Sequence, residues 1–358
     1  MATQRELARL AGVSAGTVSN VISGSTRVSD SARRKVLEAI QALNYRPNLI
    51  ARSLKTNRTN TLGIVVPDIT IPFFPKIVRG AESAARERGY FLVVLDSQGS
   101  HELEVDMMAL LRQRVDGILL VTAGDYKWSA ECVAEIASGP PVVCVDRLPE
   151  GLETDSVCVD DFGAAGLGIK HLLSLGHKNI AIITGPLTLR NEQERLRGYK
   201  RAFKDAGLPI VPSLIWSAGF EKDDVQSVVR RGIADTKPKP TAIFATNGVT
   251  GIHALRSLYE LGLETPRDIG FATIDELTAE DLFQPRITSV VQPTYDIGYR
   301  AVEALLDRIA RITRETSAAR SSVNGTKDTS AAGTSKVRLP AYLLARDSSQ
   351  MPHTKSRR

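Results

Sequence analysis

The sequence predicts an α/β protein in which two doubly wound parallel-sheet units follow a small all-α module. Short apolar runs alternate with amphipathic stretches from residue 62 onward, and the alternation starts again after Val159, as expected for two such units. Residues 1–45 instead contain three short helical patterns. The charge divides at nearly the same place: residues 1–60 carry ten Lys and Arg against three acidic residues, whereas the rest carries a net charge of −1.

The first two helical patterns lie close together and share a short connection. Thr3 with Glu6 predicts a reciprocal capping box, and the first helix then ends at Gly12. Ser14 is placed to cap a second helix over 15–22, although Gly16 in its first turn costs about 1 kcal/mol relative to alanine. The apolar stripes of the two helices are formed by Leu7, Leu10 and Ala11 in the first, and by Val18, Val21 and Ile22 in the second.

A third helix is predicted from Ser29 or Asp30 to about Asn44, with Val36, Leu37, Ile40 and Leu43 on one face. Two short helices joined by Gly-Val-Ser with a longer third one behind them is the helix-turn-helix pattern. The basic charge of this module favours a polyanion as its partner. A merely solvated basic surface is the alternative as long as charge is considered alone.

The pattern of the larger part of the chain predicts buried parallel strands and intervening helices. Doubly wound folds bind ligands at the carboxyl ends of their strands, so the default site is a cleft between the two units. Strands are predicted at 62–66, 91–95, 117–121, 142–145, 180–183, 242–246 and 270–274, and helices at 75–87, 102–112, 166–175, 193–206 and 249–261.

The last part of the chain departs from this alternation. Residues 314–336 are rich in Ser, Thr, Ala and Gly without an apolar period, which predicts a flexible excursion. The chain after residue 336 is predicted to form one more strand. The tail at 347–358 is basic and has no leucine heptad, so a tetramerising coiled coil is not expected.

Signatures of several other function classes are missing from the sequence. It has no phosphate-binding glycine loop and no G-x-S-x-G nucleophile elbow. Its five histidines and three cysteines show no metal-ligand spacing, so we expect no enzyme, no metal and no cofactor. The N-terminus lacks an apolar secretion segment and no apolar run approaches 18 residues, which indicates a cytoplasmic protein.

From about Thr3 to Arg346 the chain resembles the LacI/GalR family of bacterial transcription regulators. The resemblance is carried, in order, by LARLAGVSAGTVSNVIS, LNYRPNLIARSLKTNRTNTLGIVVPD, PFFPKIVRGAESAARERGY, VDGILL, VVCVDR, LGHKNIAIITGP, ERLRGYKRAF, PTAIFATN and ITSVVQP. It implies a DNA-binding headpiece, a hinge helix and a periplasmic-binding-protein-like core that binds an effector. It also implies a homodimer on a near-palindromic operator in double-stranded DNA.

The resemblance sets the expected domain boundaries. The headpiece spans 1–47, the hinge helix and linker 48–60, and the core 61–346. Within the core, the N-terminal lobe takes 61–159 with 292–313, and the C-terminal lobe takes 160–289 with 337–346. The excursion at 314–336 and the tail at 347–358 complete the chain.

The resemblance also implies which headpiece and hinge residues contact DNA. Ala15, Gly16 and Asn20 face the bases from the second helix, where asparagine suits adenine and alanine at most touches a thymine methyl group. In the hinge, Leu54 is the apolar wedge of the minor groove, although a leucine at that spacing, taken alone, is more often a core residue. The remaining implied DNA contacts are Thr3, Ser14, Thr17, Ser19, Ser29, Tyr45, Asn48, Ala51 and Arg52.

The effector site is implied in the same way, at Phe73, Phe74, Arg147, Asp161, Arg195, Phe220, Asn247, Asp275 and Gln292. Arg195 supplies a donor fork and Asp275 accepts from hydroxyls, with a surface salt bridge as the alternative for Arg195. The sequence departs from the family at Gly248, where aspartate is common, and at 272–276. Loss of that carboxylate beside Arg147 and Arg195 motivates the hypothesis that the effector is a sugar acid or another anionic metabolite, with a neutral sugar as the alternative.

The sequence therefore predicts a transcriptional regulator, most simply a repressor, controlled by a sugar or sugar acid. Two other function classes fit the sequence less well. A solute-binding protein for transport needs an export signal and no headpiece, and the sequence has the reverse. An α/β enzyme is disfavoured because its catalytic signatures are missing.

Overall fold

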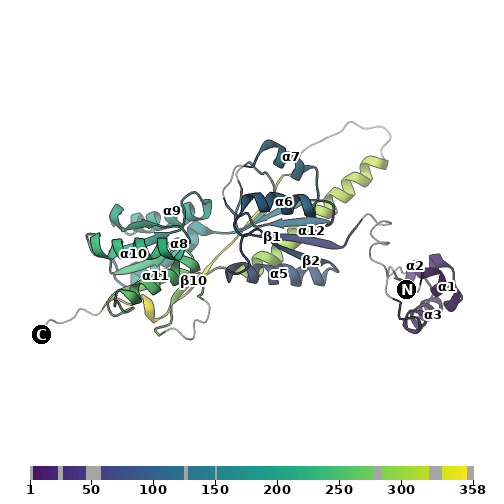
Figure 1. Ribbon diagram of the computed structural model, residues 1–358, viewed down its shortest axis with the longest axis horizontal. Helices are drawn as coiled ribbons and strands as arrows, with labels where there is room; N and C mark the ends of the chain where they lie inside the picture. Colours follow the sequence, from purple (N-terminus) through teal and green to yellow (C-terminus); the bar gives the residue numbers. More distant parts are fainter. Residues whose placement is uncertain are drawn as a thin grey trace. The chain divides into compact units, whose positions relative to one another are not determined.

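The computed structural model describes residues 3–22, 27–45, 58–124, 128–149, 151–277, 284–321 and 333–352. The chain divides into an N-terminal unit, residues 1–59, and a larger unit, residues 60–358 (Figure 1). Within the described ranges, no helix is long and apolar enough to cross a membrane.

The N-terminal unit is a three-helix module made of α1 (Gln4–Ala11), α2 (Ala15–Ile22) and α3 (Asp30–Ala42). The predicted capping box is confirmed: the Thr3 amide donates to the Glu6 carboxylate at 2.7 Å, and the Glu6 amide donates to the Thr3 hydroxyl at 3.3 Å. Gly12 ends α1 in the left-handed conformation, at φ 63°. Ser29 caps α3, and the helix begins at Asp30, which agrees with the predicted start at Ser29 or Asp30.

The apolar stripes of this unit differ in part from the predicted ones. Leu10 and Leu37 are about half exposed, and Leu43 lies just beyond the end of α3 and is also exposed. The small side chains of Ala8 and Ala39 take the core positions instead, because they let the three helices approach closely. The core is formed by Leu7, Ala8, Ala11, Val18, Val21, Val36 and Ala39.

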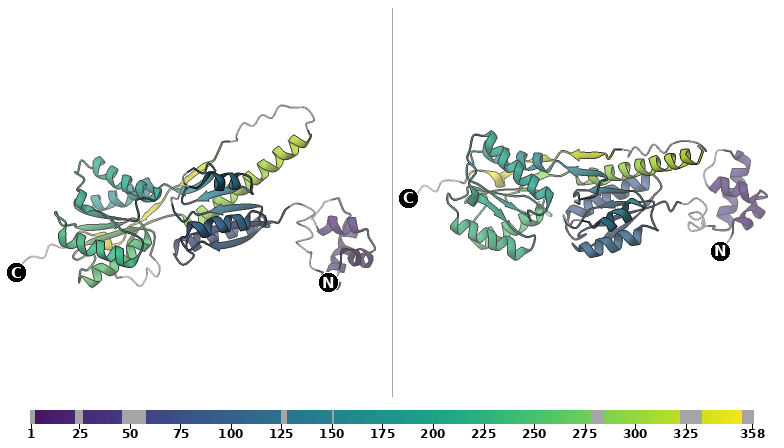
Figure 2. Two further views of the ribbon diagram at one scale, coloured as in Figure 1. Left: turned by 45° about the horizontal axis from the view of Figure 1, so that its top comes forward. Right: turned by 90° about the horizontal axis from the view of Figure 1, so that it is seen from above.

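The first lobe of the larger unit is built on a six-stranded parallel sheet with the order β11-β5-β4-β3-β1-β2. Helices α5 and α12 pack on one face of this sheet, and α6 and α7 pack on the other (Figure 2). The strands are β1 (Thr61–Val66), β2 (Phe91–Asp96), β3 (Gly117–Leu120), β4 (Val142–Val145), β5 (Asp155–Val159) and β11 (Lys336–Leu339), and the helices are α5 (Phe73–Glu87), α6 (His101–Leu111), α7 (Ala130–Ala137) and α12 (Thr294–Ser321).

The second lobe has a six-stranded sheet with the order β12-β10-β9-β8-β6-β7, parallel except for β12. Helices α8 and α9 cover one face, and α10 and α11 cover the other. The strands are β6 (Ile180–Thr184), β7 (Ile215–Ser217), β8 (Ala242–Ala245), β9 (Gly270–Ile274), β10 (Thr288–Val291) and β12 (Tyr342–Leu344), and the helices are α8 (Asp161–Ser174), α9 (Arg190–Asp205), α10 (Lys222–Asp235) and α11 (Gly248–Glu260). Two short 3-10 turns, Pro212–Leu214 and Asp347–Ser349, complete the elements of the described residues.

The prediction of one strand after the excursion is wrong. The chain forms β11 in the first sheet, parallel to β5, and then β12 in the second sheet, antiparallel to β10. Pro340 separates the two strands, because proline cannot donate to a sheet ladder. The expected assignment of 337–346 to the C-terminal lobe therefore fails for 337–339. The chain passes between the lobes at 159–161, 291–294 and 339–342.

The predicted excursion at 314–336 is also wrong at both ends. Helix α12 continues to Ser321, and β11 begins at Lys336. Residues 314–321 contain Arg, Glu and Ala, which are good helix formers that an apolar-period criterion overlooks. The Thr313 hydroxyl and the Arg314 side chain also donate to carbonyls one turn earlier, at Ile309 and Ala310. Residues 322–332 lie outside the described ranges.

Helices α5 and α12 cross with their backbones in contact. A Cβ atom at Gly298 would overlap the carbonyl oxygen of Ile77, and one at Gly80 would overlap the carbonyl oxygen of Tyr295. In contrast, a Cβ atom at Gly166 of α8 would lie 4.0 Å from its nearest neighbour, the Gly198 carbonyl oxygen. We therefore expect substitution by alanine to lower stability at the crowded glycines and not at Gly166.

Gly298→Ala is expected to destabilise the protein by about 1–3 kcal/mol, because the helices must move apart. Gly166→Ala is the matched control, and it should leave stability unchanged or raise it by up to about 1 kcal/mol through helix propensity. Urea unfolding followed by circular dichroism measures both. A stability loss of the same size in the two variants would contradict the close crossing of α5 and α12.

Candidate DNA-binding and effector sites

Helix α2 presents its first turn to solvent. Ser14 caps this turn: its hydroxyl oxygen accepts from the Thr17 amide at 3.0 Å and lies 2.9 Å from the Thr17 hydroxyl. Ala15, Gly16 and Asn20 are exposed, whereas Val18 is fully buried in the module. Packing through Val18 and Val21 together with the Ser14 cap offsets the helix-propensity cost of Gly16.

The polar residues predicted to contact phosphate lie mostly at helix starts. Thr3, Ser14 and Ser29 are exposed and each accepts a hydrogen bond from an amide three residues later. Exposed helix N-termini with hydroxyl caps are suited to bind anions. Tyr45 is half-buried against the module core, and Ser19 is half-buried on α2. Asn48, Ala51, Arg52 and Leu54 lie outside the described residues, so the hinge contacts stay predictions.

A cavity of about 350 Å³ lies between the two lobes of the larger unit, within the size range of small-molecule sites. It is lined where strands end, by residues that follow β1, β4, β8, β9 and β10, as expected for doubly wound sheets. Eight of the nine residues predicted for the effector site line it: Phe73, Phe74, Arg147, Arg195, Phe220, Asn247, Asp275 and Gln292. Asp161 does not line it and contacts Arg195 instead.

Arg195 is the centre of a buried ion-pair network in the cavity wall. Its Nε donates to Asp161 Oδ1 at 2.8 Å, and its Nη2 lies 2.7 Å from the same oxygen. Its Nη1 donates to Glu192 Oε1 at 3.2 Å and to the Thr246 carbonyl at 2.9 Å. Arg195 is 3% exposed, so the alternative of a surface salt bridge is wrong.

Glu192, one turn before Arg195 on α9, completes this network. Its carboxylate also accepts from the Gly185 amide at 3.0 Å, from the Thr246 hydroxyl and from Asn247 Nδ2 at 3.1 Å. Burial opposes the charged form of Arg195, but the carboxylates of Asp161 and Glu192 outweigh it and raise the pKa of the guanidinium. The network therefore keeps Arg195 charged. Most of the N–H groups of Arg195 donate to partners inside the protein.

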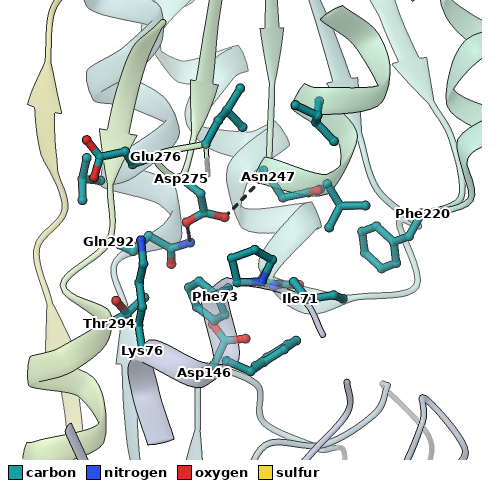
Figure 3. Close-up of a pocket in the computed structure, with 18 of the residues that line it drawn as sticks. Ile71, Phe73, Lys76, Asp146, Phe220, Asn247, Asp275, Glu276, Gln292 and Thr294 are labelled. Atoms are coloured by element: carbon teal, nitrogen blue, oxygen red, sulfur yellow. Dashed lines mark hydrogen bonds between the residues drawn. The ribbon is translucent and has the colours of Figure 1, made fainter. Parts of the chain in front are cut away.

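Asp275 stands at the carboxyl end of β9 with its side chain in the cavity (Figure 3). Its Oδ1 accepts from Gln292 Nε2 at 2.7 Å, and its Oδ2 accepts from the Gly248 amide at 3.2 Å, at the start of α11. A Cβ atom at residue 248 would lie only 3.3 Å from the Cβ of Asp275, so glycine suits this close approach. Burial outweighs these partners and raises the pKa of Asp275.

Asp146 occupies the corresponding position in the first lobe, directly after β4. Both aspartates have positive φ, 64° for Asp146 and 72° for Asp275, which is a strained conformation for residues other than glycine. Two buried oxygens of the cavity wall, Asp146 Oδ1 and Gln292 Oε1, have no hydrogen-bond partner in the described structure. Buried polar atoms are normally paired, so these acceptors suit a ligand that donates hydrogen bonds.

Arg147, Phe73 and Phe74 belong to the part of the wall that the first lobe forms. The Arg147 guanidinium lies 5.9 Å from the centre of the Phe74 ring, and its Nη1 donates to the carbonyls of Thr122 and Ala123 at 3.3 and 3.1 Å. Phe73 meets Phe74 edge to face. Phe73 and Phe220 reach the cavity from different lobes (Figure 3).

Sequence reasoning missed several lining residues. Asp146 had a usable signal, because it directly follows a predicted strand of a doubly wound sheet. Glu192 lies three residues before Arg195 on the same helix, so its contact with the guanidinium could be inferred. The sequence marks Gly248 and the segment 272–276, which contains Glu276, only as departures from the family pattern. No comparable signal marks Thr70, Ile71, Pro72, Lys76, Asn191, Val249, Ile252, Leu277, Val291 and Thr294.

A helix-turn-helix module joined to a two-lobed core with a ligand cavity defines a ligand-controlled DNA-binding regulator. Residues 3–48 match the family described as "Bacterial regulatory proteins, lacI family", and residues 59–344 match "Periplasmic binding proteins and sugar binding domain of LacI family". The chain belongs to this family of bacterial regulatory proteins. No group of three or more His, Cys, Asp or Glu residues suited to a metal occurs among the described residues.

Individual relatives span nearly the whole chain. The transcriptional repressor PurR of Pasteurella multocida is 36% identical over 86% of this chain and 92% of its own length. The ribose operon repressor of Escherichia coli K12 is 34% identical over 87% of this chain and 94% of its own. The structure of a transcriptional regulator CelR–cellobiose complex aligns with a TM-score of 0.68 and 30% identity, over 97% of this chain and all of that one.

Arg195→Leu is expected to destabilise the protein by about 3–5 kcal/mol, because it leaves two buried carboxylates without their cation. Arg197→Leu is a matched control on the same helix: Arg197 pairs with Glu194 with the same spacing, but its side chain is 65% exposed, so the cost should stay below about 1 kcal/mol. Urea unfolding of both variants measures the difference. Equal losses would contradict the role given to the buried network.

Proposed function

We propose that this chain represses transcription as a cytoplasmic homodimer on a near-palindromic operator, and that a neutral sugar in the core cavity controls its operator affinity. Membership of the lacI family supports the regulatory role, and one relative carries the name of a ribose operon repressor. The structural relative at 30% identity is described as a cellobiose complex. The proposal assigns no enzymatic activity to the chain, and the headpiece disfavours a transport role.

The observation that carries the sugar assignment is the set of acceptors in the cavity wall. Asp146 Oδ1 and Gln292 Oε1 are buried without partners in the described structure, and the Asp275 carboxylate accepts from Gln292 and from the first amide of α11. Sugar hydroxyls donate hydrogen bonds to such acceptors. Phe73 and Phe220 supply apolar surface for the carbon face of a ring.

The charge balance of the wall favours a neutral sugar over a sugar acid. Arg195 is already neutralised by Asp161 and Glu192. The positive charges of Arg147 and Lys76 are matched by the carboxylates of Asp146 and Asp275, so the wall offers no net positive charge to an anion. A carboxylate ligand would instead meet the carboxylates of Asp146 and Asp275. The hypothesis of a sugar acid, based on Gly248 and the two arginines, is therefore less favoured than the neutral alternative.

The DNA-binding half of the proposal assigns base contacts to α2 and phosphate contacts to the helix starts. Because Ala15 and Gly16 carry almost no side chain, Asn20 supplies the main bidentate contact from this helix. Close backbone approach and the hinge, with Leu54 as its proposed minor-groove wedge, then share the discrimination between sequences.

A second copy of the chain supplies the other half-site. Strand β2 is an edge of the first sheet, and Phe91, Val93 and Val94 on it are 65, 40 and 39% exposed. An exposed apolar edge strand is a surface that proteins normally cover. We propose that the partner subunit covers β2, which places two headpieces on one operator.

Sugar binding is proposed to act by changing the closure of the two lobes. The cavity lies between them, and the chain segments that connect the lobes offer a hinge. A ligand that contacts both walls stabilises the closed arrangement and so changes the population able to bind operator. A coupling free energy of about 1–3 kcal/mol gives a change of roughly 5- to 150-fold in operator affinity.

Gly16→Gln is expected to change operator preference without unfolding the headpiece. A Cβ atom at this position would lie 3.6 Å from its nearest neighbour, Ser14 Oγ, so a side chain fits. Selection from random DNA with the full chain measures the preference. Leu37→Gln, which places the same side chain on an exposed position of α3, is the matched control. An unchanged preference in Gly16→Gln would refute the assignment of this position to the bases.

Calorimetry with D-ribose, D-glucose and cellobiose, and with D-ribonate and D-gluconate, tests the effector class. At least one neutral sugar should bind and shift affinity for the selected operator, and Asp275→Asn should weaken its binding roughly 10- to 100-fold through the lost charge-assisted hydrogen bonds. Asp223→Asn, an exposed acid on α10, should bind as the unmodified protein does. Tight binding of an aldonate without its neutral sugar would overturn the proposal.

A further inference from the structure

Helix α6 carries a buried carboxyl group that lies outside the effector cavity. Glu104 is fully buried in the first lobe and is not among the residues that line the cavity. It packs beneath the turn that follows β3, at residues 122–124. A buried acid without a cation in hydrogen-bond contact is costly unless each of its oxygens is satisfied, so its partners are informative.

Among the described residues, the hydrogen-bond partners of Glu104 belong to that turn. One carboxyl oxygen, Oε2, accepts from the Ala123 amide, and the other, Oε1, lies 2.9 Å from the Thr122 hydroxyl. The same hydroxyl lies 3.0 Å from the Gly124 carbonyl oxygen. A hydroxyl has one proton to donate, so Thr122 cannot serve both oxygens at once. Both contacts are satisfied when Glu104 carries a proton and donates it to Thr122, which then donates to Gly124.

The surroundings of Glu104 are consistent with this neutral form. Burial raises the pKa of the Glu104 carboxyl to about 7, despite the opposing effects of Ala123, Thr122 and the more distant Arg147. The other titratable groups that face it are His101 on α6, whose Nδ1 lies 3.8 Å from Oε1, and Cys144 on β4.

The 122–124 turn also contacts Arg147, a residue of the cavity wall. The carbonyls of Thr122 and Ala123 accept from Nη1 of Arg147, whose guanidinium lies over Phe74. Arg147 Nε is buried and has no hydrogen-bond partner within the described residues; Asp146 Oδ2 is 3.6 Å away. The turn therefore occupies Nη1 of Arg147 and fixes where the remaining donors of the guanidinium, Nε and Nη2, lie.

We propose that Glu104 is a positioning residue for effector recognition: in its neutral form it holds the 122–124 turn, and the turn orients Arg147 in the cavity. The inference rests on the proposed function, because it gives Arg147 a ligand to contact. Glu104 does not line the cavity, and the proposal makes it a determinant of effector affinity that acts through Arg147.

Two substitutions separate positioning from simple support of the fold. Glu104→Gln reproduces the neutral carboxyl, because its amide oxygen accepts from Ala123 and its amide nitrogen donates to Thr122. Glu104→Ala removes both contacts. Glu102→Ala, an exposed acid on the same helix, is the matched control. Crystal structures of the three variants without ligand show whether Arg147 still donates to the carbonyls of Thr122 and Ala123.

The expected result is that both Arg147 contacts persist in Glu104→Gln and Glu102→Ala and are lost in Glu104→Ala. Calorimetry with D-ribose, D-glucose and cellobiose should then show a loss of affinity of roughly 3- to 30-fold in Glu104→Ala only. Between about pH 6 and about pH 8.5 the affinity of the unmodified protein should fall as Glu104 loses its proton, and Glu104→Gln should reduce that fall.

Retention of both Arg147 contacts in Glu104→Ala would overturn the proposal, and so would equal pH profiles for the unmodified protein and Glu104→Gln. If Glu104→Ala does not fold, loss of the Arg147 contacts in Glu104→Gln overturns it instead. Failure of all three sugars to bind would contradict the proposed neutral-sugar effector, whereas the ligand-free crystal structures still decide the role of Glu104.

Discussion

The ion-pair network around Arg195 is the interaction on which the effector cavity depends. It connects the start of α8 through Asp161, helix α9 through Glu192, and the end of β8 through the Thr246 carbonyl. Removing one member would leave a buried charge without its partner, which costs far more than a surface pair contributes. The network thus fixes the wall of the second lobe before any ligand binds.

This network also determines which ligand chemistry the cavity favours. Because Arg195 is neutralised within the protein, the polar groups left facing the cavity are mainly acceptors, and two of them come from aspartates at strand ends. Their left-handed backbone conformations aim the carboxylates inward, and such conformations persist only where the surrounding structure enforces them. The cavity is consequently suited to hydroxyl donors, and Arg147 and Lys76 of the opposite lobe contribute donors to its wall.

Much of the fold followed from local patterns, whereas the connections between lobes did not. The Thr3–Glu6 box and the buried runs at 62–66 and 180–183 use short-range rules, and the structure confirms them. The split of 336–344 into strands of two different sheets depends on long-range pairing that no local window contains. Similarly, the resemblance placed Asp161 beside the effector. Only the packing of α8 against α9 shows that the Asp161 carboxylate pairs with Arg195 instead.

The most direct test of the account is a crystal structure of the full chain with the neutral sugar that changes operator affinity. The account predicts that Arg195 keeps its contacts with Asp161 and Glu192, and that Asp146 and Asp275 accept hydrogen bonds from sugar hydroxyls. A structure in which Arg195 leaves both carboxylates to bind the ligand would contradict it, because the guanidinium would then be a recognition group and not part of a prebuilt wall.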